Sequence, residues 1–164
     1  MADKKITDLT ELTAVASDDY LEIVDTSANT SKKISRENLT GWHFLTSPLT
    51  SIWFDGDSFS TTAKARIDLS AIFGVPEGVK AVDVSISIRD SGSAAGTFGP
   101  YIILSPNNVS YSGRYLYCAG LPNDAWTHTG TIVPCDENGD IYYQIVASGT
   151  GTLDAIIEIW GYWL

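Results

Sequence analysis

Hydrophobic and polar residues alternate along much of the chain after residue 50. The clearest case is the segment from Val82 to Arg89, in which every second residue is Val or Ile and the residues between them are polar or charged. A period of two predicts a strand with one covered face and one face toward water. Further strand-forming segments, separated by turn residues such as Gly, Pro, Asn and Asp, are 51–54, 64–69, 99–104, 113–118, 125–133, 141–147 and 152–163.

Eight short strands without a long helical pattern predict an all-β fold. Their number and spacing favour an antiparallel β-sandwich of the jelly-roll type over residues 51–164. The one helical signal in this region is a single turn over 68–73, which Gly74 and Pro76 end.

The last predicted strand, 152–163, is apolar on both faces. Strict alternation places Leu153, Ala155, Ile157, Ile159, Gly161 and Trp163 on one face and Asp154, Ile156, Glu158, Trp160, Tyr162 and Leu164 on the other. A strand that is apolar on both faces is expected to be covered on both. Because aromatic residues are enriched at subunit interfaces, we predict an oligomer interface. Its residues would be Ile156, Trp160, Tyr162, Trp163 and Leu164. The alternative is that a loop or the N-terminal arm of the same chain covers them.

The first 40 residues have a different pattern. The three-residue spacing of Ile6, Leu9 and Leu12 predicts one or two turns of helix, and 20–24 with 31–35 predicts a hairpin. An isolated hairpin is only marginally stable in water, so we expect this arm to lie on another surface. Residues 41–50, which include Pro48, are predicted to be an ordered connector.

The charge of the chain limits the kinds of molecule that it is expected to bind. The chain has 20 acidic and 10 basic residues, a net charge of −10, and residues 115–164 contain no Lys or Arg. Binding to nucleic acid needs cations that neutralise phosphates, so no nucleic-acid partner is expected. No apolar run approaches the roughly 18 residues of a membrane-spanning helix and no signal segment is evident, so membrane insertion is not expected either.

Residues with catalytic or metal-binding chemistry are few. Cys118 and Cys135 lack a Cys-x-x-Cys spacing, and His43 and His128 complete no zinc pattern. No Gly-x-Ser-x-Gly motif is present. We therefore expect a protein that is not an enzyme and has no cofactor and no metal site.

The N-terminal arm resembles a known motif. Ile6-Thr7-Asp8-Leu9, Asp19–Asp25, Ser31–Ser35 and Glu37-Asn38-Leu39, in this order, resemble the attachment segment of tailed-bacteriophage virion proteins such as tail fibres, head fibres and capsid decoration proteins. The ending from Gly149 to Trp163 is more loosely similar to the close of phage β-sandwich domains.

The resemblance implies a trimeric protein on the virion surface, made in the host cytoplasm and bound to the particle by its N-terminal part. We therefore expect a virion-attachment arm over 1–40, a connector over 41–50 and a β-sandwich domain over 51–164. The expected function is that of a capsid decoration or head-fibre protein, a homotrimer bound to the major capsid protein or another virion protein. The expected capsid-binding residues are the apolar ones of the arm: Ile6, Leu9, Leu12, Tyr20, Leu21, Ile23, Ile34 and Leu39.

The alternative is a tail-associated receptor-binding protein that recognises host glycans. Seven of the eight tyrosines and three of the five tryptophans lie between Tyr101 and Trp163, where aromatic faces beside polar groups would suit sugars. The loops expected to contact them are 91–98, 107–112 and 121–124.

Overall fold

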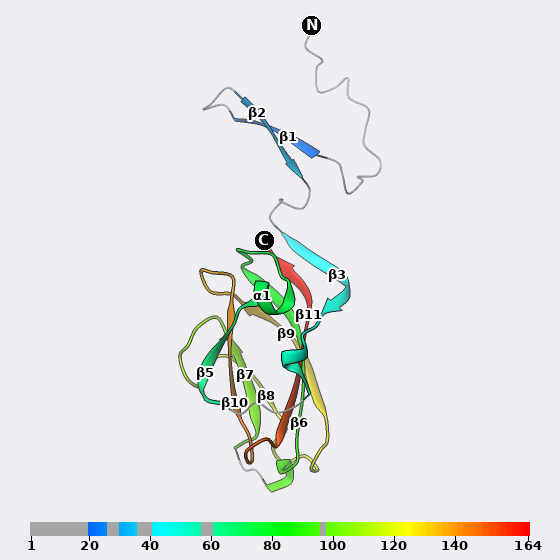
Figure 1. The fold of residues 1–164 in the computed structure, drawn as a ribbon, viewed down its shortest axis with the longest axis vertical. Coiled ribbons are helices and arrows are strands. Elements are labelled where there is room, and N and C mark those ends of the chain that lie inside the picture. Colours follow the sequence, from blue (N-terminus) through cyan, green and yellow to red (C-terminus); the bar gives the residue numbers. More distant parts are fainter. Residues whose placement is uncertain (1–19, 26–29, 36–40, 57–60, 96–97) are drawn as a thin grey trace, which may run out of the picture. The chain divides into compact units, whose positions relative to one another are not determined.

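The computed structural model describes residues 20–25, 30–35, 41–56, 61–95 and 98–164. The chain forms two compact units, unit 1 (Met1–Thr40) and unit 2 (Gly41–Leu164) (Figure 1). The described part of unit 1 is an antiparallel hairpin of β1 (Tyr20–Asp25) and β2 (Thr30–Ser35), which confirms the predicted hairpin. The helix predicted around residues 6–12 lies outside the described residues.

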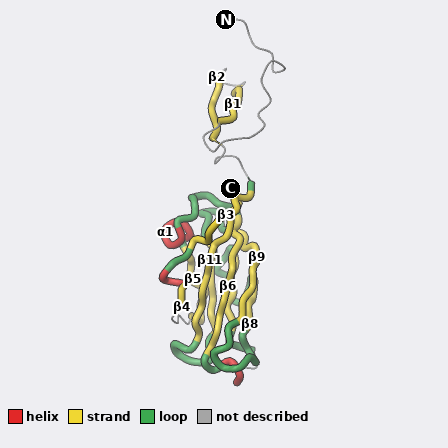
Figure 2. Tube along the Cα trace, turned by 90° about the vertical axis from the view of Figure 1, so that its right-hand side faces the viewer, coloured by secondary structure: helices red, strands yellow, loops and turns green. Residues whose placement is uncertain are grey.

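Unit 2 is built from two antiparallel sheets. Sheet I has the strand order β3 (Trp42–Leu49), β11 (Leu153–Trp163), β6 (Ala81–Asp90) and β9 (Thr127–Pro134), and the short β4 (Asp55–Gly56) also pairs with β11. Sheet II has the order β5 (Thr61–Ile67), β10 (Ile141–Val146), β7 (Tyr101–Ser105) and β8 (Arg114–Tyr117). Figure 2 shows β3, β11, β6 and β9 side by side. The remaining elements are α1 (Leu69–Phe73) and the 3-10 turns η3 (Ile52–Phe54) and η4 (Ser93–Ala95).

The main strands pair in a nested order. β7 pairs with β8, β6 with β9, β5 with β10, and β3 with β11, so that each pair encloses the previous one along the chain. Successive pairs alternate between the two sheets, an arrangement consistent with a jelly roll. The predicted all-β sandwich is therefore confirmed.

The core lies between the two sheets, where alternation predicts it. Every second residue of β6 is buried, from Val82 to Ile88, and the residues between them are half-buried. On β11, Leu153, Ile157 and Ile159 are buried in the same core. Each such side chain contributes roughly 1.5–3 kcal/mol by leaving water, so these two central strands supply much of the stability of unit 2.

Two segments of unit 2 differ from the sequence prediction. Residues 41–50 are not a separate connector, because Trp42–Leu49 is the edge strand β3 and Gly41 exchanges two backbone hydrogen bonds with Leu164 of 3.1 and 3.2 Å. Pro48 is tolerated there because one side of an edge strand needs no hydrogen-bond donor. Residues 52–54 form the turn η3 instead of a strand.

A bulge reverses the two faces of β11 near its end. Against β6, Ile159 pairs with Val84 and Gly161 pairs with Asp83, so Trp160 is an extra residue without an opposite partner. One extra residue shifts the alternation by one, so the side chains after it change faces. The predicted assignment of Gly161–Leu164 to faces is therefore wrong.

The helical turn predicted over 68–73 is confirmed as α1. The Asp68 carboxylate accepts a hydrogen bond from the Ala71 backbone N–H at 3.0 Å, and Gly74 ends the helix with a φ of 73°. These are ordinary start and stop signals that local sequence can carry.

Candidate functional site

An exposed group of aromatic rings lies on the outer face of sheet I, where β3 pairs with the end of β11. We call Trp42, Phe44, Trp160 and Trp163 the aromatic patch. Trp42 stacks on Phe44 with ring centroids 6.0 Å apart and meets the edge of Trp163 at 5.7 Å. The Trp160 indole N–H donates to Glu158 at 3.3 Å. Phe44 is 74% exposed, Trp163 40% and Trp160 39%, so the patch remains open to a partner although Trp42 contacts both Phe44 and Trp163.

The structure places three of the five predicted interface residues on the outer face of sheet I and two against the core. Trp160 and Trp163 belong to the aromatic patch, and Ile156 is half-buried opposite Ser87 on the outer face. Tyr162 and Leu164 pack against the core instead. The bulge at Trp160 is the reason, since it turns Tyr162 inward, where its ring stacks on His43 at 5.2 Å.

Two residues of the aromatic patch were missed from the sequence. Trp42 and Phe44 lie in the segment predicted to be a connector, although their spacing of two residues is a strand signal. Gly161 opposes Phe44, and a Cβ at Gly161 would lie 3.0 Å from the His43 carbonyl oxygen and 3.5 Å from the Phe44 ring. The glycine therefore allows the β3 backbone at His43 to lie close to β11.

The predicted capsid-binding residues belong to unit 1. Tyr20, Leu21 and Ile23 lie on β1 and Ile34 on β2, with Leu21 directly opposite Ile34. Ile6, Leu9, Leu12 and Leu39 lie outside the described residues.

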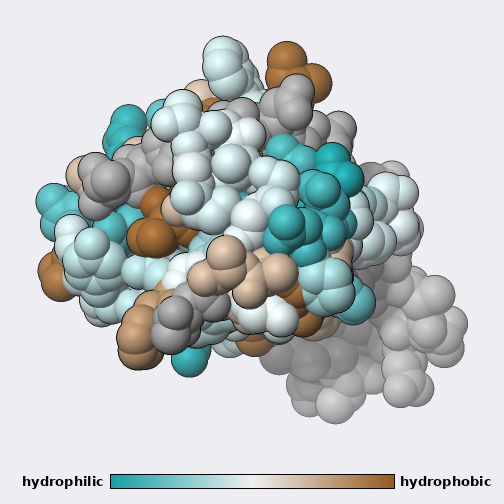
Figure 3. All heavy atoms as spheres, turned by 90° about the horizontal axis from the view of Figure 1, so that it is seen from below, coloured by the Kyte–Doolittle hydropathy of each residue, from teal (hydrophilic) through white to brown (hydrophobic). Residues whose placement is uncertain are grey.

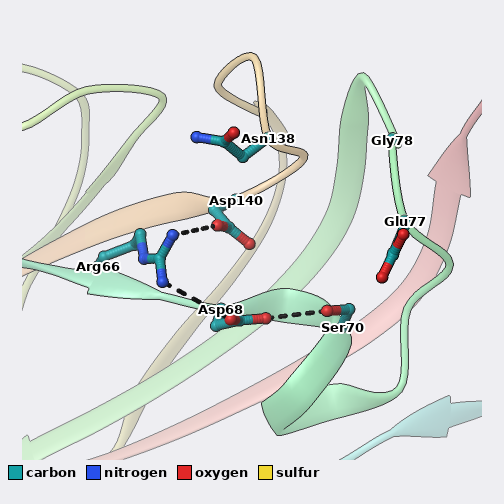
Figure 4. A pocket seen from close by; sticks show the side chains of 7 residues that line it. All are labelled: Arg66, Asp68, Ser70, Glu77, Gly78, Asn138 and Asp140. Carbon is teal, nitrogen blue, oxygen red and sulfur yellow. Dashed lines mark hydrogen bonds and ion pairs between the residues drawn. The ribbon is translucent and has the colours of Figure 1, made fainter.

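A polar pocket of about 430 Å³ lies beside α1. Figure 4 shows the Arg66 guanidinium between two carboxylates, 3.0 Å from Asp140 and 3.6 Å from Asp68. The other oxygen of Asp140 accepts the Leu69 backbone N–H at 3.1 Å. Asp68 also accepts the Ser70 hydroxyl at 2.9 Å. Both oxygens of Asp140 are thus engaged within the protein, and the cluster joins β5, α1 and the turn before β10.

The two carboxyl groups of this pocket have shifted pKa values. Burial and the negative charges of Asp68 and Asp136 together raise the pKa of Asp140 more than the hydrogen bond from Leu69 and the charge of Arg66 lower it. The hydrogen bonds from Ala71 and Ser70 lower the pKa of Asp68. Opposite shifts of two carboxyls can mark an acid and a base. Here the Arg66 bridge and the helix cap account for both groups, so we assign the cluster a structural role.

The loops predicted to contact glycans do not form one cluster. Loops 91–95 and 121–124 lie together, because Ser93 donates to the Leu121 and Pro122 carbonyls and Ala94 donates to Asn123. Loop 107–112 follows the other end of β7. Figure 3 shows the end with the first two loops, where brown apolar residues lie as separate spots among white and teal ones.

The two cysteines are free thiols. Burial raises the pKa of Cys118 to about 11 and that of Cys135 to about 12. Since the thiolate is the reactive form, both have the properties of packing residues rather than nucleophiles.

Within the described ranges, no helix is long and apolar enough to cross a membrane. The same residues contain no group of three or more His, Cys, Asp and Glu that could hold a metal ion. In the comparison with protein-family models, none matches this chain. The search of curated proteins likewise finds no match.

Proposed function

We propose that this chain is a non-enzymatic structural protein of a tailed-bacteriophage virion, a capsid decoration or head-fibre protein. Unit 1 binds the major capsid protein or another virion protein, and unit 2 projects from the virion surface as a homotrimer. The observation that carries the proposal is the aromatic patch, which lies at the end of unit 2 where Gly41 is hydrogen-bonded to Leu164.

The exposed area suits an interface between copies. Ile52 and Trp53 of η3, which lies against β11, are 89% and 71% exposed. Together with the aromatic patch they expose an area on the order of 600 Å², from side-chain areas of about 150–250 Å² each. Each partner in a standard interface contributes about 800 Å². Aromatic contacts of this size can hold subunits together when water is excluded around them.

The position of the patch also fits attachment. Trp42 directly follows Gly41, the first residue of unit 2, so contact between three patches brings the three chain junctions close together. Three arms that leave from neighbouring points bind one particle with avidity, which compensates for a weak individual hairpin.

Association is tested by light scattering coupled to size exclusion at micromolar concentration. We expect three times the 17.7 kDa chain mass for the natural protein. Trp163→Glu should dissociate it, since truncating a central aromatic of an interface costs about 2–4 kcal/mol. Trp126→Glu is the matched control, because Trp126 is 45% exposed and lies under the Arg89 guanidinium at 4.9 Å, near the other end of sheet I. A monomeric natural protein would refute the trimer.

Attachment is tested with particles of the encoding virus that lack the protein. The full chain should cosediment with them, and cryo-electron microscopy should place it on the head. The fragment 41–164 and the variant Leu21→Asp should not bind, whereas Glu22→Gln, on the neighbouring β1 position, should bind normally. Binding by 41–164 would show the arm assignment to be wrong, and loss of adsorption by the particles would favour a receptor-binding protein.

A further inference from the structure

The outer face of sheet II is rich in tyrosine. Tyr101 of β7 lies opposite Tyr117 of β8, and Tyr115 lies two residues before Tyr117 on the same face. Tyr115 and Tyr117 stack nearly parallel, at 8° and 5.5 Å between centroids, and Tyr101 contacts both rings at 5.5 and 5.2 Å. Tyr101 is buried beneath them, whereas Tyr115 and Tyr117 are 37% and 50% exposed. We call these three residues, together with Tyr111, the tyrosine face.

The loop 106–113 folds over the same side of sheet II and adds polar groups to it. The Tyr111 backbone N–H donates to the buried side chain of Gln144 at 2.9 Å, and the Tyr115 hydroxyl donates to the Tyr111 carbonyl. Ile103, between these residues on β7, is completely buried although it lies outside the main core. The loop is therefore packed on the sheet, and its Tyr111 carbonyl is bound by the Tyr115 hydroxyl while the Tyr111 side chain is exposed.

Lys64 holds this loop in place. Its ammonium group donates to the Ser105 hydroxyl, to the Ser112 carbonyl and, at 3.4 Å, to the Asn107 carbonyl. Gly113 ends the loop with a φ of 146°, and a Cβ there would lie 2.3 Å from the Leu104 carbonyl oxygen. A loop fixed in this way loses little entropy when it binds a ligand. Its exposed Asn, Ser and Tyr residues have the composition of antibody combining sites, in which tyrosines supply contact area and Asn and Ser supply hydrogen bonds.

The charge of sheet II is opposite to that of the rest of the molecule. Its four strands contain no Asp or Glu but contain Lys64, Arg66 and Arg114, in a chain of net charge −10. The strands of sheet I contain five acidic residues and one arginine. Arg66 is paired with Asp68 and Asp140, but no ion pair between described side chains includes Lys64, whose three acceptors are neutral. Its positive charge is therefore left to attract an anion at the tyrosine face.

We propose that the tyrosine face binds an oligosaccharide that carries carboxylate groups. The apolar faces of the sugar rings pack on Tyr115, Tyr117 and Tyr111, and their hydroxyl groups bond to the Asn and Ser side chains of loop 106–113. The sugar carboxylates lie toward Lys64. This site concerns unit 2 alone and does not depend on whether the protein is attached to a virion.

Two other occupants fit the observations less well. A second copy that docks its acidic sheet I on this face would join opposite faces of the sandwich, and such contacts repeat into an open stack instead of closing. A nucleic acid needs several cations to neutralise its phosphates, and with Arg66 paired to two carboxylates the strands of sheet II offer only Lys64 and Arg114.

The test is calorimetric titration of the full chain with hexasaccharides of galacturonate, sialate and hyaluronan. Maltohexaose is the neutral control and a hexaglutamate peptide is the non-sugar polyanion. We expect at least one acidic sugar to bind about tenfold more tightly than either control, and raising the salt from about 50 to about 500 mM should weaken it. No binding by any acidic sugar, or equal binding by hexaglutamate, would overturn the proposal.

Variants locate the site. Tyr117→Ala should weaken binding about tenfold, whereas Tyr117→Phe, which keeps the ring, should weaken it less than about threefold. Trp126→Ala, which removes an exposed aromatic side chain outside both the aromatic patch and the tyrosine face, should leave the affinity unchanged. Circular dichroism shows whether each variant is folded. An unchanged affinity in Tyr117→Ala, an equal loss in Trp126→Ala, or stacking of the protein alone that Tyr117→Ala abolishes would each exclude the tyrosine face as the sugar site.

Discussion

At the scale of single residues, Asp90 organises the end of the sandwich that Figure 3 shows. Its side chain is completely buried at the end of β6 and accepts backbone N–H groups of Gly92 at 2.7 Å and Ser148 at 3.0 Å. The hydroxyl groups of Ser148 and Thr152 donate to the same carboxylate. One side chain thus ties the turn after β6 to the turn between β10 and β11.

The pKa of Asp90 reflects these bonds. Burial by itself would raise it, but the hydrogen bonds from Ser148, Gly92 and Thr152 outweigh burial and hold the pKa below its ordinary value of 3.8. A carboxyl whose pKa is lower in the folded state stabilises the fold above the unfolded pKa, and this contribution is lost as the pH falls through the folded pKa.

We therefore predict that Asp90→Asn lowers the free energy of unfolding at pH 7 by about 2–4 kcal/mol, because two of the four donors would face the amide NH2 group instead of a carboxylate oxygen. The natural protein should lose stability below about pH 4, and the variant should lose less of it over the same range. Urea unfolding at neutral and acidic pH measures both the loss of stability at pH 7 and its dependence on pH. Asp83→Asn, an outward position of the same strand, is the control and should change stability by less than about 0.5 kcal/mol. Parallel pH curves for the natural protein and Asp90→Asn would contradict this account.

At the scale of elements, the bulge in β11 decides which side chains face a partner. The pairing with β6 is regular on both sides of Trp160, which is the single unpaired residue. Since strand faces alternate with a period of two, removing the bulge residue leaves every other side chain on its present face.

We predict that deleting Trp160 leaves unit 2 folded, with a loss of no more than about 2 kcal/mol, because pairing of Ile159 with Val84 and of Gly161 with Asp83 is kept. Deleting Glu158 instead should move the fully buried Ile159 to the outer face and turn Trp160 inward, at a cost of at least about 3 kcal/mol. Denaturant unfolding of the two deletions distinguishes them. Equal losses would show that the bulge has no role in setting the faces.

At the scale of the whole molecule, the division into two units has a direct thermodynamic consequence. Among the residues whose side chains the structure describes, the hydrophobic core lies in unit 2, between Leu49 and Leu164. Strand β3, at the start of unit 2, pairs with strand β11, at the end of unit 2. The sandwich is therefore complete within residues 41–164.

We predict that the fragment 41–164 folds by itself, with a midpoint of thermal unfolding within about 4 °C of the full chain. The fragment 51–164, which lacks β3, should be less stable by several kcal/mol, because it uncovers the edge of β11 and removes the partners of Trp163 and Tyr162. Calorimetry of the full chain and of the fragments 41–164 and 51–164 measures these differences in stability. Failure of 41–164 to fold would show that unit 2 depends on residues 1–40.

The proposed site was only partly predictable from the sequence. Trp160 and Trp163 were recognised because their strand is apolar on both faces, a local property. Trp42 and Phe44 were missed because nothing near residue 42 indicates pairing with residue 163, which lies at the other end of unit 2. The tyrosine face depends on the β7–β8 pairing and on the packing of loop 106–113, and only the composition of that region hinted at it.

The sequence by itself determined where the strands from β5 to β11 form, which residues of β6 are buried, and where α1 begins and ends, because alternation and capping depend on neighbours within a few residues. Only the tertiary structure decided that residues 42–49 complete sheet I, that Tyr162 faces inward and that the tyrosines of sheet II gather on one face. The physical reason is that strand pairing and a bulge are settled by contacts between residues far apart in the chain, which no local pattern encodes.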